Sequence, residues 1–225
     1  MKTRLFATVS LLLVFQFCFL SCEKNPTNSE NDTVKDIDGN VYQTVKIGDQ
    51  WWMAENLKVT HYRNGDAIPN VTDGTEWSNL STGAYCNYEN DANNAVTYGS
   101  LYNWYAVDDS RNIAPKGWHV PSDAEWTTLT TYLGGESVAG VKLKSANGWN
   151  NDGNGTDEYS FAVLPGGYRF YFGTFDGMGY CAFFWSSTEG YSGYAWTRLL
   201  YYNYSDVSRL NGNKQYGFSV RCVRD

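Results

Sequence analysis

The chain has 225 residues, of which 17 are basic and 24 are acidic, and its formal charge is −7. This acidic balance argues against nucleic acid as a partner and against electrostatic docking on anionic lipid. Aromatic side chains make up 17% of the residues, with 18 Tyr and 9 Trp, and such a content suits both a packed core and a surface that recognises another molecule.

The N-terminus has the pattern of an export signal. Lys2 and Arg4 precede an apolar run over residues 5–20, which is too short for a comfortable transmembrane helix but suits the hydrophobic region of a signal peptide. The run closes with Phe19-Leu20-Ser21-Cys22, which resembles the bacterial lipobox, where the cysteine carries the lipid. We therefore expect a signal peptide at 1–21, lipidation of Cys22, and a location at the bacterial outer membrane, on the cell surface. The alternative is an ordinary cleavage site beside an ordinary cysteine.

Residues 22–35 are predicted to be a flexible tether, because this polar stretch cannot bury enough apolar surface to fold. The remaining segment, 36–225, has about 190 residues, which suits one domain better than two. The membrane contact is then made through the N-terminal lipid only.

Elements in the first half of the domain follow from periodicity and turn residues. Alternating apolar and polar residues over 37–53 predict short strands joined by tight turns. The segment 60–97 is rich in Asn, Asp, Gly, Ser and Thr, which predicts long loops. Helical spacing predicts a short helix over 98–107, and a capping box at Ser122–Glu125 predicts a second helix over 123–133.

The second half of the domain is predicted to be rich in strands. Short β-type runs separated by glycine occupy 161–164, 167–172, 182–186, 195–202 and 218–223. Together with the two helices, they predict an α+β fold with two short helices, small antiparallel sheets and long loops.

Three cysteines follow the tether, Cys86, Cys181 and Cys222. Disulfides persist outside the cytoplasm, so one pair and one free thiol are expected. Spacing leaves the pairing open, and we favour Cys86 with Cys222.

Six segments occur together in a characteristic order. They are Asp38-Gly-Asn-Val-Tyr42, Trp51-Trp-Met-Ala-Glu-Asn-Leu57, Gly117-Trp-His-Val-Pro-Ser-Asp-Ala-Glu-Trp126, Leu164-Pro-Gly-Gly-Tyr-Arg169, Trp185-Ser-Ser-Thr-Glu189 and Gly217-Phe-Ser-Val-Arg-Cys222. This set resembles the Fibrobacter succinogenes major paralogous domain family, found in lipoproteins of Bacteroidetes and related bacteria, over roughly residues 36–225.

The resemblance implies a C-type-lectin-like fold, related to the formylglycine-generating sulfatase-modifying proteins. Members of the family often carry a cysteine just before the proline that precedes the Gly-Trp-His segment. Here Ala114 precedes Pro115. The resemblance therefore implies that the usual disulfide partner of Cys222 is absent.

The residues give an enzyme little support. His61 and His119 are the only histidines, and a lone histidine such as His119 is more often packed and hydrogen-bonded than a catalytic base. Cys181 and Cys222 lie on separate predicted strands, so their spacing does not make a redox pair. We therefore assign no catalytic residue.

The oxygen-rich loop 152–158 is a candidate calcium site, because hard oxygen ligands cluster there, but it lacks the spacing of an EF-hand. Loops of this composition are usually turns, so no cofactor and no metal ligand are assigned. The Glu-Pro-Asn and Gln-Pro-Asp tripeptides of calcium-dependent lectins are also missing.

The segment 190–216 carries the candidate binding residues. Tyr, Ser, Gly, Asn and Asp dominate it, as they dominate antibody paratopes, because Tyr gives rigid contact area and small polar residues adapt. On a strand, Trp196, Arg198 and Leu200 would share a structural face, while Thr197, Leu199 and Tyr201 would share an exposed one. The candidates are Tyr191, Tyr194, Thr197, Leu199, Tyr201, Tyr202, Tyr204, Asp206, Ser208, Asn211, Asn213 and Tyr216.

Each candidate position holds an amino acid that adenine changes within an Asn codon can reach, so the segment also resembles the variable region of diversity-generating retroelement proteins; ordinary loop drift is the alternative. We expect a non-catalytic surface protein that binds an external protein or glycan. The alternatives are an enzyme of the formylglycine-generating type and a structural envelope or adhesion protein. The oligomeric state is left open.

Overall fold

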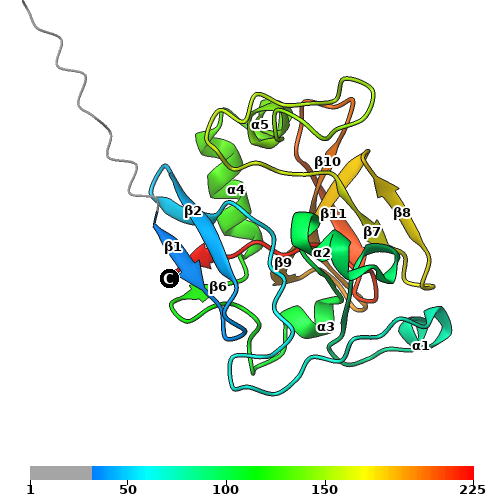
Figure 1. Ribbon diagram of the computed structural model, residues 1–225. Coiled ribbons are helices and arrows are strands. Elements are labelled where there is room, and N and C mark those ends of the chain that lie inside the picture. The colour runs from blue at the N-terminus through cyan, green and yellow to red at the C-terminus, as the bar shows by residue number, and fades with distance from the viewer. Residues whose placement is uncertain (1–31) are drawn as a thin grey trace, which may run out of the picture. The chain divides into compact units, whose positions relative to one another are not determined.

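The computed structural model describes residues 32–225 as a mixed α+β domain with two five-stranded sheets and five α-helices (Figure 1). The predicted signal peptide, Cys22 and most of the predicted tether lie outside the described residues. Over residues 32–225, no helix combines the length and the apolar character that a membrane crossing needs.

The first sheet has the strand order β1-β2-β3-β12-β6, and β1, β2 and β6 lie at the left of Figure 1. Its strands are β1 Thr33–Lys35, β2 Val41–Ile47, β3 Gln50–Met53, β12 Val223–Arg224 and β6 Trp118–His119. The strands expected over 37–53 are confirmed, with Gly39 and Gly48 at φ of 88° and 60° in the two turns. β1 pairs with β2, so Thr33–Lys35 belong to the folded domain and not to the tether.

The second sheet has the order β11-β10-β9-β7-β8, with β7, β8 and β11 at the right of Figure 1. Its strands are β11 Ser208–Asn213, β10 Tyr194–Tyr201, β9 Cys181–Glu189, β7 Gly166–Arg169 and β8 Phe175–Met178. The strand expected at 182–186 is confirmed within β9, and the strand expected at 195–202 is confirmed as β10, which ends one residue earlier. The run at 167–172 is a strand only to Arg169, and the runs at 161–164 and 218–223 form mainly isolated bridges to distant partners. The pairing of β7 with β9 is parallel, so the sheets are not purely antiparallel.

The helices are α1 Gly74–Ser78, α2 Ala92–Tyr98, α3 Trp104–Val107, α4 Asp123–Tyr132 and α5 Glu136–Leu143, with a short 3₁₀ turn η1 at Tyr88–Asn90. The capping box at Ser122 and Glu125 is present, which confirms the helix expected at 123–133. The expected helix 98–107 is wrong in its first half, because Leu101–Tyr102 form β5 and pair with β4 (Tyr85–Cys86). The expectation of two helices is also wrong: α1 and α2 occupy the region assigned to loops, and α5 was missed.

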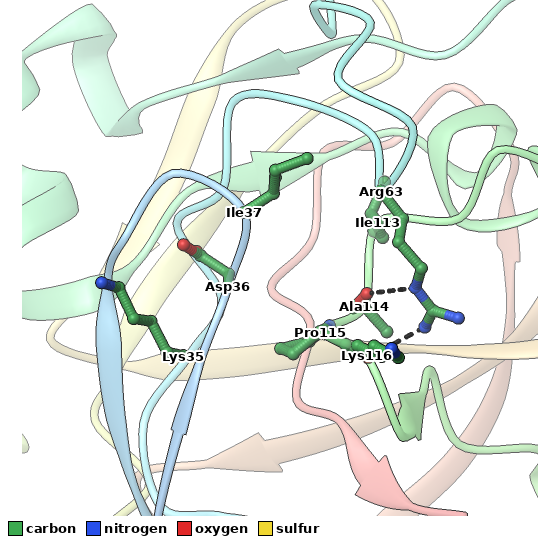
Figure 2. Close-up of a pocket in the computed structure, with 8 residues that line it drawn as sticks. All are labelled: Lys35, Asp36, Ile37, Arg63, Ile113, Ala114, Pro115 and Lys116. Carbon is green, nitrogen blue, oxygen red and sulfur yellow. Dashed lines mark hydrogen bonds between the residues drawn. The ribbon is translucent and has the colours of Figure 1, made fainter.

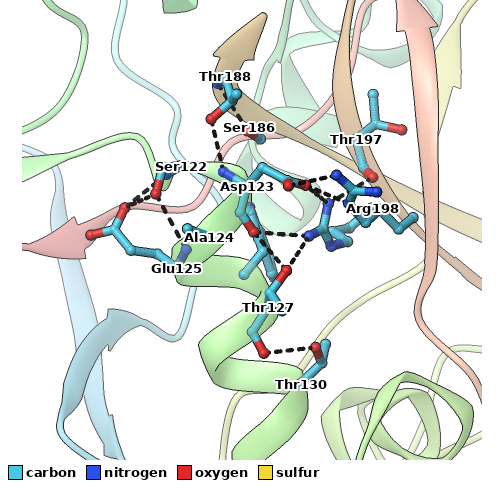
Figure 3. A network of polar contacts seen from close by, with 12 residues as sticks. Ser122, Asp123, Ala124, Glu125, Thr127, Thr130, Ser186, Thr188, Thr197 and Arg198 are labelled. Carbon is cyan, nitrogen blue, oxygen red and sulfur yellow. Dashed lines mark hydrogen bonds and ion pairs between the residues drawn. The ribbon is translucent and has the colours of Figure 1, made fainter. Parts of the chain in front are cut away.

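Helix α4 is fastened to the inner face of the second sheet (Figure 3). The buried guanidinium of Arg198, on β10, donates to the carboxylate of Asp123 at 2.8 Å. The backbone N–H of Asp123 donates to Oγ1 of Thr188, on β9, at 3.0 Å. Beneath these contacts, the rings of Trp126 and Phe184 pack with centroids 5.5 Å apart. The inner side chains Phe184 and Leu200 therefore lie in one buried core cluster with Trp126, whereas Phe183, Leu199 and Tyr201 on the opposite face are partly exposed.

Cys86, Cys181 and Cys222 are all free and buried, so the expected disulfide between Cys86 and Cys222 is wrong. The reason is their placement: Cys86 belongs to a small buried cluster with Trp77 and Leu101, whereas Cys222 belongs to the main core. Ala114 lies in that same main core cluster.

Candidate functional site

The outer face of the second sheet contains the candidate site. In the β9–β10 register, Leu199 is opposite Phe183 and Tyr201 is opposite Cys181. On the other side of β10, Leu199 is opposite Ser208 of β11. Because side chains alternate along a strand, these residues share the face that points away from α4.

Thr197 lies on this same face, opposite Trp185, but it is only 1% exposed. Its methyl group and the buried rings of Trp185 and Phe218 all lie close to Gly212, so packing covers this part of the face. The expectation that Thr197 is exposed is therefore wrong. Trp196, expected to be structural, is half-buried under the guanidinium of Arg209, whose carbon lies 3.4 Å from the ring centroid. Arg198 and Leu200 are buried as expected.

Two adjacent hollows open on the outer face, with volumes of about 220 and 150 Å³. Tyr168 of β7 and Phe183 of β9 line both hollows and form the wall between them. The first hollow is completed by Asp176, Gly177, Tyr180, Cys181, Leu199 and Tyr201. The second is completed by Thr197, Leu210, Asn211, Gly212, Tyr216 and Phe218.

Aromatic rings form a continuous chain across this surface. The Phe183 and Phe218 rings stack at 4.6 Å, and those of Phe218 and Tyr216 stack at 5.1 Å. Tyr171 then meets Tyr216 edge-on at 5.6 Å. We call the surface made by these rings and the two hollows the aromatic face. It consists of Tyr168, Phe170, Tyr171, Phe172, Tyr180, Phe183, Leu199, Tyr201, Tyr204, Leu210, Tyr216 and Phe218.

The margins of the aromatic face are open to solvent. Phe172 is 49% exposed, Tyr204 is 54% exposed and Leu210 is 41% exposed. Large apolar side chains gathered in this way on a surface mark interaction sites more often than isolated ones do.

The structure brings six of the twelve predicted residues onto this surface. Thr197, Leu199, Tyr201, Asn211 and Tyr216 line the hollows, and the ring of Tyr204 lies 5.6 Å from that of Tyr201.

The other six do not line the hollows. Tyr202 packs edge-on against Tyr180 and against the inner core. Tyr191 and Tyr194 stack on each other near the β9–β10 turn. Asp206 and Ser208 bond to each other at 2.7 Å, and Asn213 accepts a bond from the backbone N–H of Gln215.

Sequence reasoning missed the half of the face contributed by β7, β8 and β9. Tyr168, Phe183 and Asp176 lie outside the segment 190–216 and enter the site only through strand pairing. The Tyr171-Phe172 pair was the available signal, since two adjacent large aromatic residues beside Gly173 suggest an exposed turn.

Hydrogen bonds from Lys144 hold the loop that follows β10 in place. The ammonium of Lys144, which is 3% exposed, donates to the carbonyls of Tyr201, Tyr202 and Tyr204 at 3.3, 3.0 and 3.0 Å. Burial lowers the pKa of Lys144, and the charge of Asp206 opposes this shift. These bonds fix the backbone that presents Tyr201 and Tyr204.

Side-chain oxygens of the candidate calcium loop 152–158 accept hydrogen bonds from the backbone on either side of it. Asp157 Oδ1 accepts from the N–H of Ala162 at 2.8 Å, and Asn154 Oδ1 accepts from the N–H of Trp149 at 3.0 Å. Within 32–225, no group of three or more His, Cys, Asp or Glu residues is placed to hold a metal ion.

The thiols have the opposite character to reactive cysteines. Burial raises the pKa of Cys86 and of Cys181 to about 12. A nucleophilic or redox-active thiol instead has a lowered pKa and is partly exposed.

A further hollow of about 250 Å³ lies between β1 and the loop that precedes β6 (Figure 2). Arg63 lines this hollow, and its guanidinium donates to three backbone carbonyls at 2.6 to 3.0 Å. Asp36 lines it too, and its carboxylate accepts from the hydroxyl of Tyr42 at 2.6 Å. Because Arg63 and Asp36 are hydrogen-bonded within the protein, these two side chains hold the loops together.

His119 bridges two carboxylates. Its Nδ1 lies 2.6 Å from Asp225 Oδ1, and its Nε2 lies 2.8 Å from Glu125 Oε1. Partial burial lowers the pKa of His119, but the bonds to Asp225 and Glu125 outweigh it and raise the pKa above 6.5. The side chain thus ties the C-terminus to the capping box of α4.

We expect this bridge to make stability depend on pH. A histidine whose pKa is raised in the folded state stabilises the fold below its unfolded pKa, and the contribution is lost as the pH rises through the folded pKa. His119→Gln should therefore lower the melting temperature at about pH 5.5 and have a smaller effect at about pH 9. An NMR titration of His119 should give a midpoint above 6.5 that falls in Asp225→Asn. A midpoint of 6.5 or below in the unmodified chain would contradict the bridge.

Comparison with known proteins places the chain in a family. The family model described as the Fibrobacter succinogenes major domain matches residues 45–224, well over half of the chain. No curated protein sequence and no solved structure matches it significantly. The chain therefore belongs to the Fibrobacter succinogenes major domain family.

Proposed function

We propose that this domain is a non-catalytic binding module that recognises an external protein or glycan through the aromatic face. One observation carries the proposal: aromatic side chains from β7, β9, β10 and the 215–218 segment form a continuous, partly exposed surface around two hollows. A C-type-lectin-like fold, as the family resemblance implies, would suit this use.

The framework supports the proposal because it is rigid where the contacts lie. Arg198 and Asp123 fasten the inner side of β10 to α4, and Lys144 holds the loop that carries Tyr204. Tyrosines on a fixed backbone lose little conformational entropy on binding, and Tyr is enriched among the residues that dominate binding energy.

The export pattern completes the proposal. A lipid on Cys22 would hold the domain at the outer membrane, and the polar residues that follow would let the aromatic face reach a partner outside the cell. If a retroelement diversifies the chain, the variable positions that would alter the hollows are Thr197, Leu199, Tyr201, Asn211 and Tyr216. The test is to sequence the neighbouring DNA for a reverse transcriptase and a near-copy of the last coding segment.

Arrays of glycans and of extracellular proteins, probed with the mature chain, test the binding function. We expect binding at micromolar concentration to a defined ligand. The double variant Tyr204→Ser/Leu210→Ser should bind that ligand at least about tenfold more weakly, because two exposed contact residues are truncated. Its melting temperature should change little, since both side chains are exposed.

Tyr132→Ser is the matched control, because Tyr132 is 57% exposed but lies on α4, away from the outer face of the sheet. It should bind like the unmodified chain. Equal binding by the double variant, or no binding to either array at about 100 µM, would overturn the proposal; the second result would favour a structural role.

A further inference from the structure

We infer that the first hollow receives the ammonium end of a lysine side chain from an external protein. This inference rests on the proposed binding function and deepens it, since it selects a protein ligand over a glycan. Three features of the hollow carry it: its aromatic walls, its charge and its size.

The walls are aromatic and meet at steep angles. Tyr168 and Phe183 lie with ring centroids 5.0 Å apart and planes inclined by 61°. Tyr180 and Tyr201 complete the lining. Ring faces carry partial negative charge, so several rings around one space attract a cation, as in the aromatic cages that bind methylated lysine. A sugar ring stacks best on one flat exposed ring, and an inclined corner is less suited to it.

The only charged side chain among the residues that line this hollow is the carboxylate of Asp176. It is exposed at the rim of β8, and its Oδ1 accepts a 2.7 Å bond from the N–H of Gly177. Burial is the main cause that raises the pKa of Tyr168 and of Cys181, and the negative charge of Asp176 is the second cause. The charge of Asp176 therefore acts on the groups that line the hollow. An entering cation would therefore meet a negative potential, with no basic lining residue to oppose it.

The size of the hollow fits a compact group. Its volume of about 220 Å³ is below the range of pockets that enclose drug-sized ligands. The neighbouring hollow, beyond the wall formed by Tyr168 and Phe183, has no charged lining residue among those described. It would receive an apolar side chain next to the lysine, so the two hollows together suit a peptide surface with one cationic and one apolar residue.

Titration with small probes tests this inference directly. We would follow tyrosine and backbone NMR signals of the mature chain with Nα-acetyl-lysine methylamide, and with its neutral analogue Nα-acetyl-norleucine methylamide. The lysine probe should bind at millimolar concentration and shift signals of Tyr168, Gly177 and Tyr201. The norleucine probe should bind about tenfold more weakly, because it lacks the cation.

Asp176→Asn should weaken binding of the lysine probe about five- to tenfold and leave the norleucine probe unaffected. Tyr201→Leu, which keeps an apolar side chain but removes the ring, should weaken the lysine probe similarly. Asp152→Asn, another exposed aspartate outside both hollows, is the matched control and should change neither.

Equal affinity for both probes, or an unchanged lysine affinity in Asp176→Asn, would overturn the inference. The inference would also be overturned if the array ligand is a glycan and the double variant Tyr204→Ser/Leu210→Ser no longer binds it. If the array ligand depends on the aromatic face while the lysine probe fails, the binding function stands and the lysine site is withdrawn. If both fail, both are withdrawn.

Discussion

Arg221→Met is expected to lower the free energy of unfolding by about 2–4 kcal/mol, because three acceptors, two of them buried, would lose their donor. Arg221 is 1% exposed, and its guanidinium donates to the side chain of Asn56 at 2.8 Å and to the carbonyls of Phe161 and Ala162. Burial lowers its pKa to about 9, so the charge is held at a cost that methionine would relieve. The two backbone carbonyls remain in the variant without a donor, and this cost exceeds the gain from removing a buried charge. The net effect is therefore destabilising.

The same substitution should loosen a strained loop. Ser160 and Ala162 have φ of 56° and 52°, a left-handed conformation that is unfavourable for residues with a side chain. Arg221 holds this loop through two of its bonds, so hydrogen exchange over 157–163 should accelerate in the variant. Arg224→Met is the control, because Arg224 has a half-exposed side chain and should shift stability by about 0.5 kcal/mol or less. Equal denaturation midpoints for Arg221→Met and the unmodified chain would contradict the assigned role.

The fold could be predicted from the sequence where local chemistry decides it. Helix α4 was found because Ser122 and Glu125 cap it within four residues of chain. Helix α5 was missed because Gly135 precedes it without a side-chain cap. The bridges that Val163 and Phe218 make depend on Lys144 and Tyr102, which are distant in sequence, so no local pattern could define their partners.

Prediction of the site was limited for a related reason. The composition of 190–216 indicated a binding surface, and Leu199, Tyr201 and Tyr216 line the hollows. Alternation places Thr197 on the same face as Leu199, but Thr197 is buried there beside Trp185 and Phe218, and this tertiary packing is not visible in the periodicity of β10. The contribution of Tyr168 follows from the parallel pairing of β7 with β9, a tertiary contact that periodicity does not reveal.

Asp123→Ala should be at least as damaging as Arg221→Met, with an expected loss of about 3–5 kcal/mol in the free energy of unfolding. Asp123 accepts from Arg198 at 2.8 Å and from Arg209 at 2.9 and 2.8 Å. The side chain of Arg198 is fully buried, and its Nε has no hydrogen-bond partner among the residues described. Removing the carboxylate would therefore leave a buried, largely uncompensated charge between α4 and β10.

The pH dependence of this variant separates loss of the ion pair from loss of packing. Burial raises the pKa of Asp123, but the bonds from Arg209 and Arg198 outweigh it and lower the pKa below 3.8. A carboxyl group with a lowered pKa stabilises the fold above its unfolded pKa, and the contribution is lost as the pH falls through the folded pKa. The stability difference between the unmodified chain and Asp123→Ala should therefore be constant from about pH 5 to 7 and shrink below about pH 3.8. Glu158→Ala, which breaks an exposed pair with Lys142 at 3.9 Å, should cost about 0.5 kcal/mol or less.

Asp123→Ala should also weaken ligand binding at the aromatic face, although Asp123 lies on the opposite side of the sheet, because Arg198 fastens β10 from the inner side. Full affinity in the folded variant would show that the aromatic face does not depend on this anchor.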